Sequence, residues 1–280
     1  MRTSALQKVF RKKIPLLCAI VIGFFLIIAF SAQFLGLASN WDTPIGTQYL
    51  PPNLSEFKFW LGTDYLGRSV ILKVIQGARV ALSVGVVTTL LSAPIGVFFG
   101  CVSGYFGGLI DELILWFITT LSSIPNILLL IGISYSLGRG MTAVYIALTA
   151  TSWISLARIL RGEVIKHKQK EYLIAAEALG AGNGRRIFIH LLPNVMHQVI
   201  LSMTFMFEMA IRAEVLLSYL QLGVQNLPSW GKMIDDANGE LGNGVWWQLT
   251  GATVAMFFLM FSINVLGDYV RDALDPKANI

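Results

Sequence analysis

Charge is scarce in this 280-residue sequence, because Lys, Arg, Asp and Glu together make up only 13% of the residues. Soluble globular domains contain about 25% of these residues. Hydrophobic residues reach 55%, and the mean hydropathy is +0.67. A soluble core cannot bury so large an apolar fraction. The composition therefore excludes an ordinary soluble domain and predicts a protein that lies mostly in lipid.

Residues that bind metals or form disulfides are also few. The two cysteines, Cys18 and Cys101, lie inside apolar runs, where a free cysteine behaves as a small hydrophobic residue, so they do not indicate a redox compartment. The three histidines, His167, His190 and His197, do not have the spacing of a ligand set. We therefore expect structural or solvated histidines and no metal site.

Motifs for chemistry are missing as well. The sequence has no G-x-x-x-x-G-K-[ST] loop to hold nucleotide phosphates, and no nucleophile motif accompanies its Ser, Asp and His residues. We therefore expect no enzyme activity and no cofactor in this chain. The net charge of +5 arises from basic residues clustered near apolar segments, which favours orientation in a membrane over nucleic-acid binding.

What the sequence does contain is long apolar runs. A helix needs about 20 mostly apolar residues to cross the hydrocarbon core, because its backbone polar groups must be paired within the helix. Three runs pass this test outright, without a charged residue. To them we add a first apolar run after the basic N-terminus, a short fourth run of 17 residues, and a fifth run that three charged residues interrupt. They predict six transmembrane helices, at residues 14–37, 80–102, 113–137, 141–157, 191–221 and 245–267.

Basic residues and tryptophans give the expected orientation. Residues 1–13 are basic like the start of a signal peptide, but the apolar run that follows is longer than usual, so an uncleaved anchor is favoured. With the N-terminus inside, 14 of the 21 Lys and Arg residues fall in cytoplasmic segments and six in exterior ones. Both termini are therefore expected in the cytoplasm. Five tryptophans near the outer interface agree: Trp41, Trp60, Trp230, Trp246 and Trp247.

A short amphipathic helix is predicted between the fourth and fifth spans. Tyr172, Ala175, Ala176 and Leu179 follow a helical spacing, and Gly180 is a suitable C-terminal cap. Such a helix can rest on lipid headgroups or fit a groove on a partner protein. Its alanines favour the groove, because small side chains allow close backbone contact and add little lipid affinity, although the spacing leaves both alternatives open.

Three charged residues interrupt the fifth span: Glu208, Arg212 and Glu214. A charge in the hydrocarbon costs at least about 2.5 to 3.5 kcal/mol unless it is paired or hydrated. Glu208 and Arg212 are four residues apart and can pair along a helix. The three residues are candidates for a translocation pathway, with mutual neutralisation against neighbouring helices as the alternative.

The short helix carries a specific resemblance. Ala175-Ala176, Gly180 and Leu192-Pro193 resemble the EAA signature of ABC-importer permeases, although Ile174 stands where glutamate usually precedes the alanines. The resemblance implies a coupling helix that seats in an ATPase subunit. The residues implied in this contact are Glu171, Tyr172, Ala175, Ala176, Leu179 and Gly180.

Further strings resemble the oligopeptide, dipeptide and nickel permease family, and within it the C-type subunit. Gly62, Thr63, Asp64, Gly67 and Arg68 are similar to an exterior motif of that family. The other matching strings are residues 104–108 with Asp111-Glu112, Pro125 in the third span, Ala213-Glu214, residues 222–225, residues 228–231, residues 266–268 and residues 271–276.

The resemblance implies a type I ABC-importer permease in the bacterial inner membrane that translocates oligopeptides or dipeptides. The implied partners are a second homologous permease subunit, two ATPase subunits that bind ATP and Mg²⁺, an exterior substrate-binding protein and membrane lipid. An importer of nickel or another small solute is an alternative. A secondary transporter driven by an ion gradient, and a membrane-anchored enzyme, are the competing classes.

The expected fold is all-α and membrane-embedded, in four parts. Residues 1–40 form the cytoplasmic N-terminus and first span. Residues 41–77 form an exterior segment with a helix lying along the membrane surface, whose apolar face is made by Leu66, Val70, Ile71, Val74 and Ile75. Residues 78–275 form a five-helix core that includes the coupling helix within 163–184, and residues 276–280 are the tail.

Overall fold

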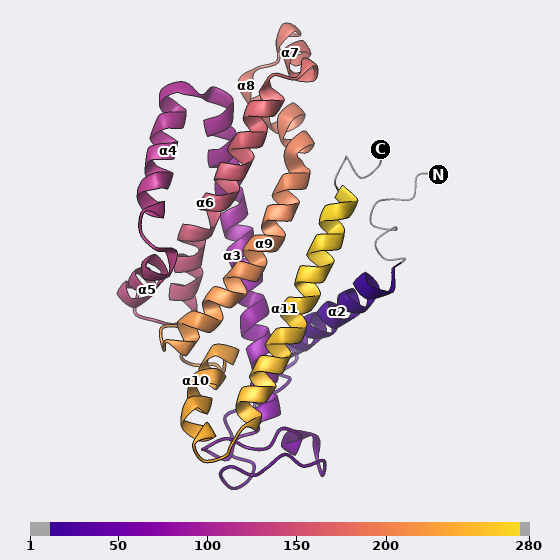
Figure 1. The fold of residues 1–280 in the computed structure, drawn as a ribbon, viewed down its shortest axis with the longest axis vertical. Helices are drawn as coiled ribbons and strands as arrows, with labels where there is room; N and C mark the ends of the chain where they lie inside the picture. The colour runs from indigo at the N-terminus through magenta and orange to yellow at the C-terminus, as the bar shows by residue number, and fades with distance from the viewer. Residues whose placement is uncertain (1–11, 275–280) are drawn as a thin grey trace.

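The computed structural model describes residues 12–274 as an elongated assembly of helices (Figure 1). Within that range the only β-pairing consists of two isolated bridges, Pro44 with Arg68 and Thr63 with Ser69. The prediction of an all-α chain is therefore confirmed for the described residues. The helices are α2 (Lys13–Phe34), η1 (Phe57–Phe59), α3 (Val70–Phe106), α4 (Gly108–Ser122), α5 (Asn126–Ser136), α6 (Met141–Lys168), α7 (Glu171–Ala178), α8 (Asn183–Arg185), the π-helical η2 (Arg186–Leu191), α9 (Leu192–Tyr219), α10 (Trp230–Leu241) and α11 (Trp247–Leu274).

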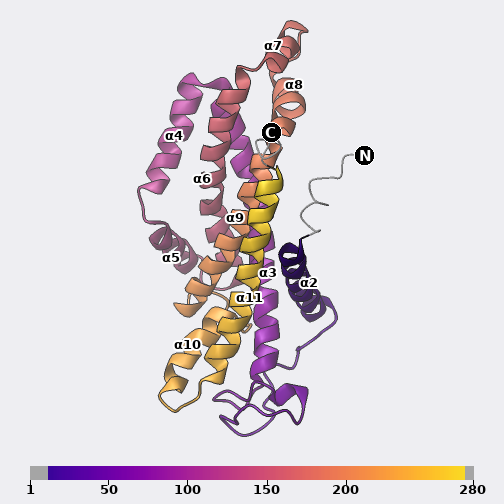
Figure 2. The ribbon, with the colours of Figure 1, turned by 45° about the vertical axis from the view of Figure 1, so that its right-hand side comes forward.

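The long helices run back and forth between two ends of the molecule. The short helix α7 lies at one end, and residues 35–69 lie with α10 at the opposite end in both views (Figures 1 and 2). We call these the α7 end and the loop end. The start of α2 lies near the last turns of α11, with the Lys12 ammonium 5.0 Å from the centre of the Tyr269 ring.

Four of the described helices are long and apolar enough to cross a membrane, namely α2, α3, α6 and α11. The bent pair of α4 and α5 raises the number to five if it counts as one span. Helix α9 has 28 residues but is not in this set, because polar residues near its start and three charged residues farther along interrupt its apolar run. The predicted number of six spans is therefore not reached by length and apolarity alone.

The helix expected along the membrane surface is not a separate element. Val70, Ile71, Val74 and Ile75 instead form the first turns of α3, which continues without a break for 37 residues. Ser69 caps its start, because the Ser69 hydroxyl accepts a hydrogen bond from the Leu72 N–H. This part of the chain therefore packs as the beginning of a long helix, and its apolar residues contact α2 and α11.

The third predicted span is not straight. Helices α4 and α5 meet at an angle of 83° across residues 123–125. Pro125 explains the break, because it has no N–H to continue the helical hydrogen bonds and it disfavours helical geometry at Ile124. Because residues 113–137 contain no charged side chain, they were predicted to form one continuous span. Pro125 instead divides this region into two short helices.

Helices α3 and α6 pack closely through a row of glycines. A Cβ atom added to Gly96, Gly100 or Gly104 would lie 2.8–2.9 Å from atoms of α6, closer than real Cβ contacts allow. The three glycines are spaced four residues apart and therefore share one face of α3. The three glycines therefore serve close helix packing, and α3 and α6 form a central two-helix unit.

Replacing Gly100 with Ile is expected to lower the free energy of unfolding by roughly 1–3 kcal/mol, because the new side chain would overlap Ala157 and Leu160 of α6. The measurement is the thermal midpoint of the protein purified in detergent. Gly162→Ile is the matched control, since no atom lies within 4 Å of a Cβ added at Gly162. Equal losses of stability in the two variants would contradict the close-packing role.

Candidate functional site

Helix α7 is a short, cleanly terminated helix. The Ala181 N–H donates to the Ala176 carbonyl and the Gly180 N–H donates to the Glu177 carbonyl, which is the paired hydrogen-bond pattern of a Schellman cap. Gly180 adopts φ +80°, a conformation that glycine reaches without strain. The predicted C-terminal cap at Gly180 is confirmed, and the cap ends α7 immediately before the turn that leads to α8.

The side chains of α7 divide into a buried side and an exposed side. Leu173 and Ala176 are buried and Tyr172 is half-buried, whereas Ala175 is exposed. The Leu179 side chain is 88% exposed. The predicted stripe from Tyr172 to Leu179 is therefore not one exposed face. The apolar surface that α7 offers outward is formed by Ile174, Ala175, Ala178 and Leu179, with Glu171 beside it.

Side-chain contacts attach α7 to neighbouring helices. The Tyr172 hydroxyl lies 3.0 Å from Nδ1 of His167 in α6, and Glu177 forms an ion pair of 2.7 Å with Arg186 in η2. The Arg186 guanidinium in turn lies over the ring of Tyr105 at the end of α3, 5.5 Å from its centre. A displacement of α7 would therefore act directly on α6 and η2, and through Arg186 on α3.

The ends of α4 and α6 are joined beside this site. Arg161 makes two hydrogen bonds of 2.6 Å to the two carboxylate oxygens of Asp111, and Ser103 of α3 donates to the same carboxylate. Such a two-point pair fixes geometry as well as charge. At the α7 end, the Asp111 carboxylate therefore connects α4 with α6 through Arg161 and with α3 through Ser103.

At the loop end, the predicted exterior motif forms a tight buried turn around Asp64. Both Thr63 and Asp64 are 0% exposed. One Asp64 oxygen accepts the backbone N–H groups of Leu66 and Arg68, each at 2.9 Å, and the other accepts the Arg68 side chain at 2.8 Å. Gly62 and Gly67 both have positive φ, and a Cβ on either would lie within 2.4 Å of a backbone oxygen. The motif residues therefore shape the turn itself.

Lys73 connects this turn to the last two helices. Its ammonium lies 3.0 Å from Asp64, 2.7 Å from the Gln248 side-chain oxygen in α11 and 3.6 Å from Asp236 in α10. Burial by itself raises the pKa of Asp64, but Lys73 and Arg68 outweigh it and lower this pKa below its ordinary value. The spacing of charged residues in the sequence did not reveal Lys73, because its partners are up to 175 residues away.

Two tryptophans strengthen the same junction. The Trp247 indole N–H donates to the Thr63 carbonyl at 2.8 Å, and the Trp230 indole N–H donates to the Val74 carbonyl at 3.1 Å. Both rings are buried. The two tryptophans, expected near the outer interface from sequence, therefore hold residues 62–68, α3, α10 and α11 together.

Glu240 is a buried acid near this junction. It is 2% exposed, and burial raises its pKa to about 7, although Lys73 acts in the opposite direction. Because its pKa is higher in the folded state, the folded protein holds this proton at pH values where the unfolded chain has lost it. The free energy of unfolding therefore falls as the pH rises from about 4.5 to about 7, because over this range the unfolded chain releases the Glu240 proton that the folded protein retains.

Replacing Glu240 with Gln is expected to remove this loss, so the variant should have the higher thermal midpoint at pH 8 and a flatter profile between pH 5 and 7. The measurement is the midpoint of unfolding in detergent across that range. The pKa of Asp64 is lowered from its ordinary value of 3.8, so Asp64 titrates below pH 3.8 and does not affect the profile between pH 5 and 7. Asp235→Asn on the same helix is the control, and the same flattening in that variant would refute the role of Glu240.

The three charged residues of α9 do not form one site. Glu208 is 6% exposed and pairs with Arg212, and it also accepts a 2.9 Å hydrogen bond from Asn264 of α11. The Arg212 side chain is 51% exposed. Glu214 is completely buried and accepts a 2.6 Å hydrogen bond from Ser218. Glu208 and Arg212 thus neutralise each other between α9 and α11, and Glu214 is enclosed on another side of α9.

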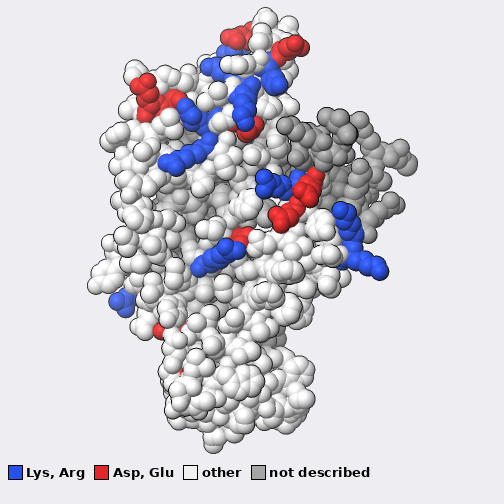
Figure 3. Space-filling model, in the orientation of Figure 1, with Lys and Arg blue, Asp and Glu red and all other residues white. Residues whose placement is uncertain are grey.

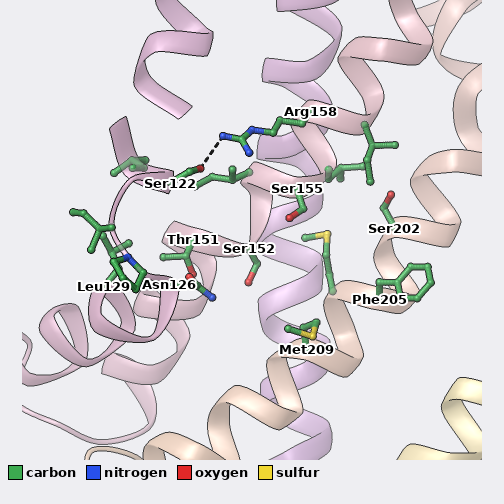
Figure 4. Close-up of a pocket in the computed structure, with 17 residues that line it drawn as sticks. Ser122, Asn126, Leu129, Thr151, Ser152, Ser155, Arg158, Ser202, Phe205 and Met209 are labelled. Carbon is green, nitrogen blue, oxygen red and sulfur yellow. Dashed lines mark hydrogen bonds between the residues drawn. The ribbon is translucent and has the colours of Figure 1, made fainter. Parts of the chain in front are cut away.

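A pocket of about 460 Å³ opens beside the break between α4 and α5. Helices α6 and α9 complete its wall, and Figure 4 shows Ser122 and Arg158 meeting across the gap between the end of α4 and α6. Its polar lining residues are Ser122, Asn126, Thr151, Ser152, Ser155, Arg158 and Ser202. The pocket was not predicted from the sequence, although four of these residues lie at helical spacing on α6.

The comparisons with known proteins agree on one family. Residues 96–280 match the family described as "Binding-protein-dependent transport system inner membrane component". The dipeptide transport system permease protein DppC of Bacillus subtilis (strain 168) is 38% identical over 275 residues, which cover 98% of this chain and 85% of that protein. The oligopeptide transport system permease protein OppC of the same strain is 36% identical over 266 residues, covering 95% and 86%.

A third relative is the glutathione transport system permease protein GsiD of Pectobacterium atrosepticum, 33% identical over 219 residues that cover 78% of this chain and 72% of that protein. The two Bacillus subtilis relatives match almost the whole chain. They confirm the resemblance based on the short motifs and the prediction of a permease instead of an enzyme. The chain therefore belongs to the family of inner-membrane components of binding-protein-dependent transport systems.

Proposed function

We propose that this chain is a permease subunit of an ATP-driven importer of short peptides. The observation that carries the proposal is the exposed apolar surface of α7, which is fixed to α6 and η2 at one end of the helices. The names of the relatives, which refer to dipeptide, oligopeptide and glutathione transport, support the substrate class. The α7 surface is the proposed docking site for an ATPase subunit.

The proposed topology has six spans, with the α4–α5 pair as the third and α9 as the fifth. Helix α9 is included because its 28 residues are long enough and because Glu208 and Arg212 are paired, which lowers the cost of placing them in lipid. The α7 end and both termini are assigned to the cytoplasm. Figure 3 supports this side, since most charged side chains visible on that face gather toward the α7 end.

The proposed complex has a second homologous permease subunit, two ATPase subunits that bind ATP and Mg²⁺, and an exterior substrate-binding protein. Nucleotide-driven closure of the ATPase pair would move α7. The contacts of Tyr172 with His167 and of Glu177 with Arg186 then transmit the movement into α6 and η2, and η2 continues directly into α9. The proposed role of this chain is therefore mechanical, and its helices alternate between inward-open and outward-open arrangements.

Replacing Leu179 with Asp tests the docking surface. The side chain is 88% exposed, so the substitution should leave folding intact, while a buried contact with an ATPase subunit would lose apolar area and gain an unpaired charge. We expect co-purification of the ATPase subunits and peptide-coupled ATP hydrolysis to fall by about tenfold or more, the effect of losing at least 1.4 kcal/mol of contact energy.

Leu54→Asp is the matched control, because Leu54 is 84% exposed but lies at the loop end. Its complex should assemble and hydrolyse ATP like the unaltered protein. Full coupling in the Leu179 variant would rule out docking at α7. Purified chain that transports peptide without any ATPase subunit, driven by an ion gradient, would instead support a secondary transporter.

A further inference from the structure

The pocket beside the α4–α5 break presents polar groups where the helices are otherwise apolar. Ser155 lies near the middle of the 28-residue α6, and both Ser155 and Asn126 are exposed to the pocket space. Polar side chains within transmembrane segments usually face a bundle interior or a water-filled cavity, because hydrocarbon cannot hydrogen-bond to them. These residues therefore indicate that water reaches this side of α6.

The break itself supports the same conclusion. Residues 123–125 are non-helical and exposed, and they lie between two halves of an apolar span. Irregular backbone at membrane depth is tolerated only where protein covers it or where it lines a water-filled cavity. The break and the polar residues of α6 belong to one pocket, so a single aqueous cavity accounts for both.

Arg158 gives the pocket its charge. Its guanidinium donates a 3.0 Å hydrogen bond to the Ser122 hydroxyl, and no Asp or Glu of residues 12–274 forms an ion pair with it. The contrast is Arg161, less than one turn farther along α6, which is neutralised by Asp111. An exposed cation beside hydroxyl and amide groups is suited to the reversible binding of an anion.

We propose that this pocket is a transient binding site for the C-terminal carboxylate of a peptide in transit. Arg158 pairs with the carboxylate, and Ser155 and Asn126 hydrogen-bond to the adjoining peptide group. Phe205 and Met209 of α9 also line the pocket and contact peptide side chains of varied shape, since methionine adapts to irregular surfaces. The proposal rests on the proposed peptide-import function and names the part of the peptide that the permease binds.

The size of the pocket fits this occupant. Its 460 Å³ lies within the range of about 300–1,000 Å³ that is usual for small-molecule sites. A free carboxylate is present at the end of every unmodified peptide, whatever its sequence. A site built on one cation and on adaptable apolar residues therefore recognises the class of peptides without selecting particular side chains.

The test is thiol labelling of Ser155→Cys in the complete complex, reconstituted with its ATPase and second permease subunits. The native Cys18 and Cys101 are replaced with Ala; both are buried. A membrane-impermeant methanethiosulfonate reagent should modify the new cysteine. Dialanine should slow the modification, and its C-terminal amide should need about tenfold more ligand for the same protection, because it lacks a charge-assisted pair worth about 1.4 kcal/mol.

Ile146→Cys is the control, because Ile146 lies on the same helix and is 46% exposed but does not line the pocket. Dialanine should not change its modification rate. Adding Arg158→Gln to the Ser155 variant should abolish the difference between dialanine and the amide, and Arg158→Lys should retain part of it. Equal protection by both ligands in the presence of Arg158 would overturn the carboxylate assignment.

Failure of this inference can be separated from failure of the proposed function. If the complex imports peptide with ATP but Ser155→Cys resists the reagent in every nucleotide state, a lipid or a helix of the second permease subunit covers the pocket and the inference is wrong. If the reagent modifies Ser155→Cys but dialanine neither slows the modification nor is imported or coupled to ATP hydrolysis, the proposed function is wrong and the binding site falls with it.

Discussion

The close contact of α3 with α6 is the feature on which the other parts of the structure depend. Gly96, Gly100 and Gly104 bring the two backbones together, since any side chain at these positions would overlap α6. Helix α3 leads from the Asp64 turn at the loop end, and α6 leads to the α7 contact through His167. The two-helix unit therefore connects the turn of residues 62–68 with α7, and α6 lines the polar pocket between them.

Several buried or half-buried charges of this apolar chain are neutralised in groups. Asp64 is matched by Arg68 and Lys73, Asp111 by Arg161, and Glu208 by Arg212. The first group stabilises a turn, the second joins α4 to α6, and the third lies along α9, because an isolated charge removed from water is too costly to keep. Arg158 departs from this pattern, because its guanidinium donates a hydrogen bond to the Ser122 hydroxyl and not to a carboxylate. A charged residue without an ion-pair partner in a membrane protein is a candidate for a functional site.

The two ends of the molecule are built for different tasks. At the loop end, Lys73, Trp230 and Trp247 fix the turn around Asp64 to α3, α10 and α11, so residues 62–68 are a structural junction and not a free recognition loop. At the α7 end, the helix leaves Leu179 almost fully exposed. A tightly connected loop end and an exposed apolar surface at the α7 end suit the proposed role of a subunit that is moved as a body by a partner.

The amino-acid sequence by itself determined the helical class, the family and the cap at Gly180, because these follow from apolar length, short motifs and the conformational freedom of glycine. It also indicated that Glu208 and Arg212 would pair, since four residues along a helix bring side chains together. Only the tertiary structure decided that Val70 begins a long helix, that Pro125 bends the third span by 83°, and that Lys73 meets Gln248. Periodicity describes contacts within a helix, whereas the pocket around Arg158 arises where residues from four helices meet, and no local spacing specifies which helices become neighbours.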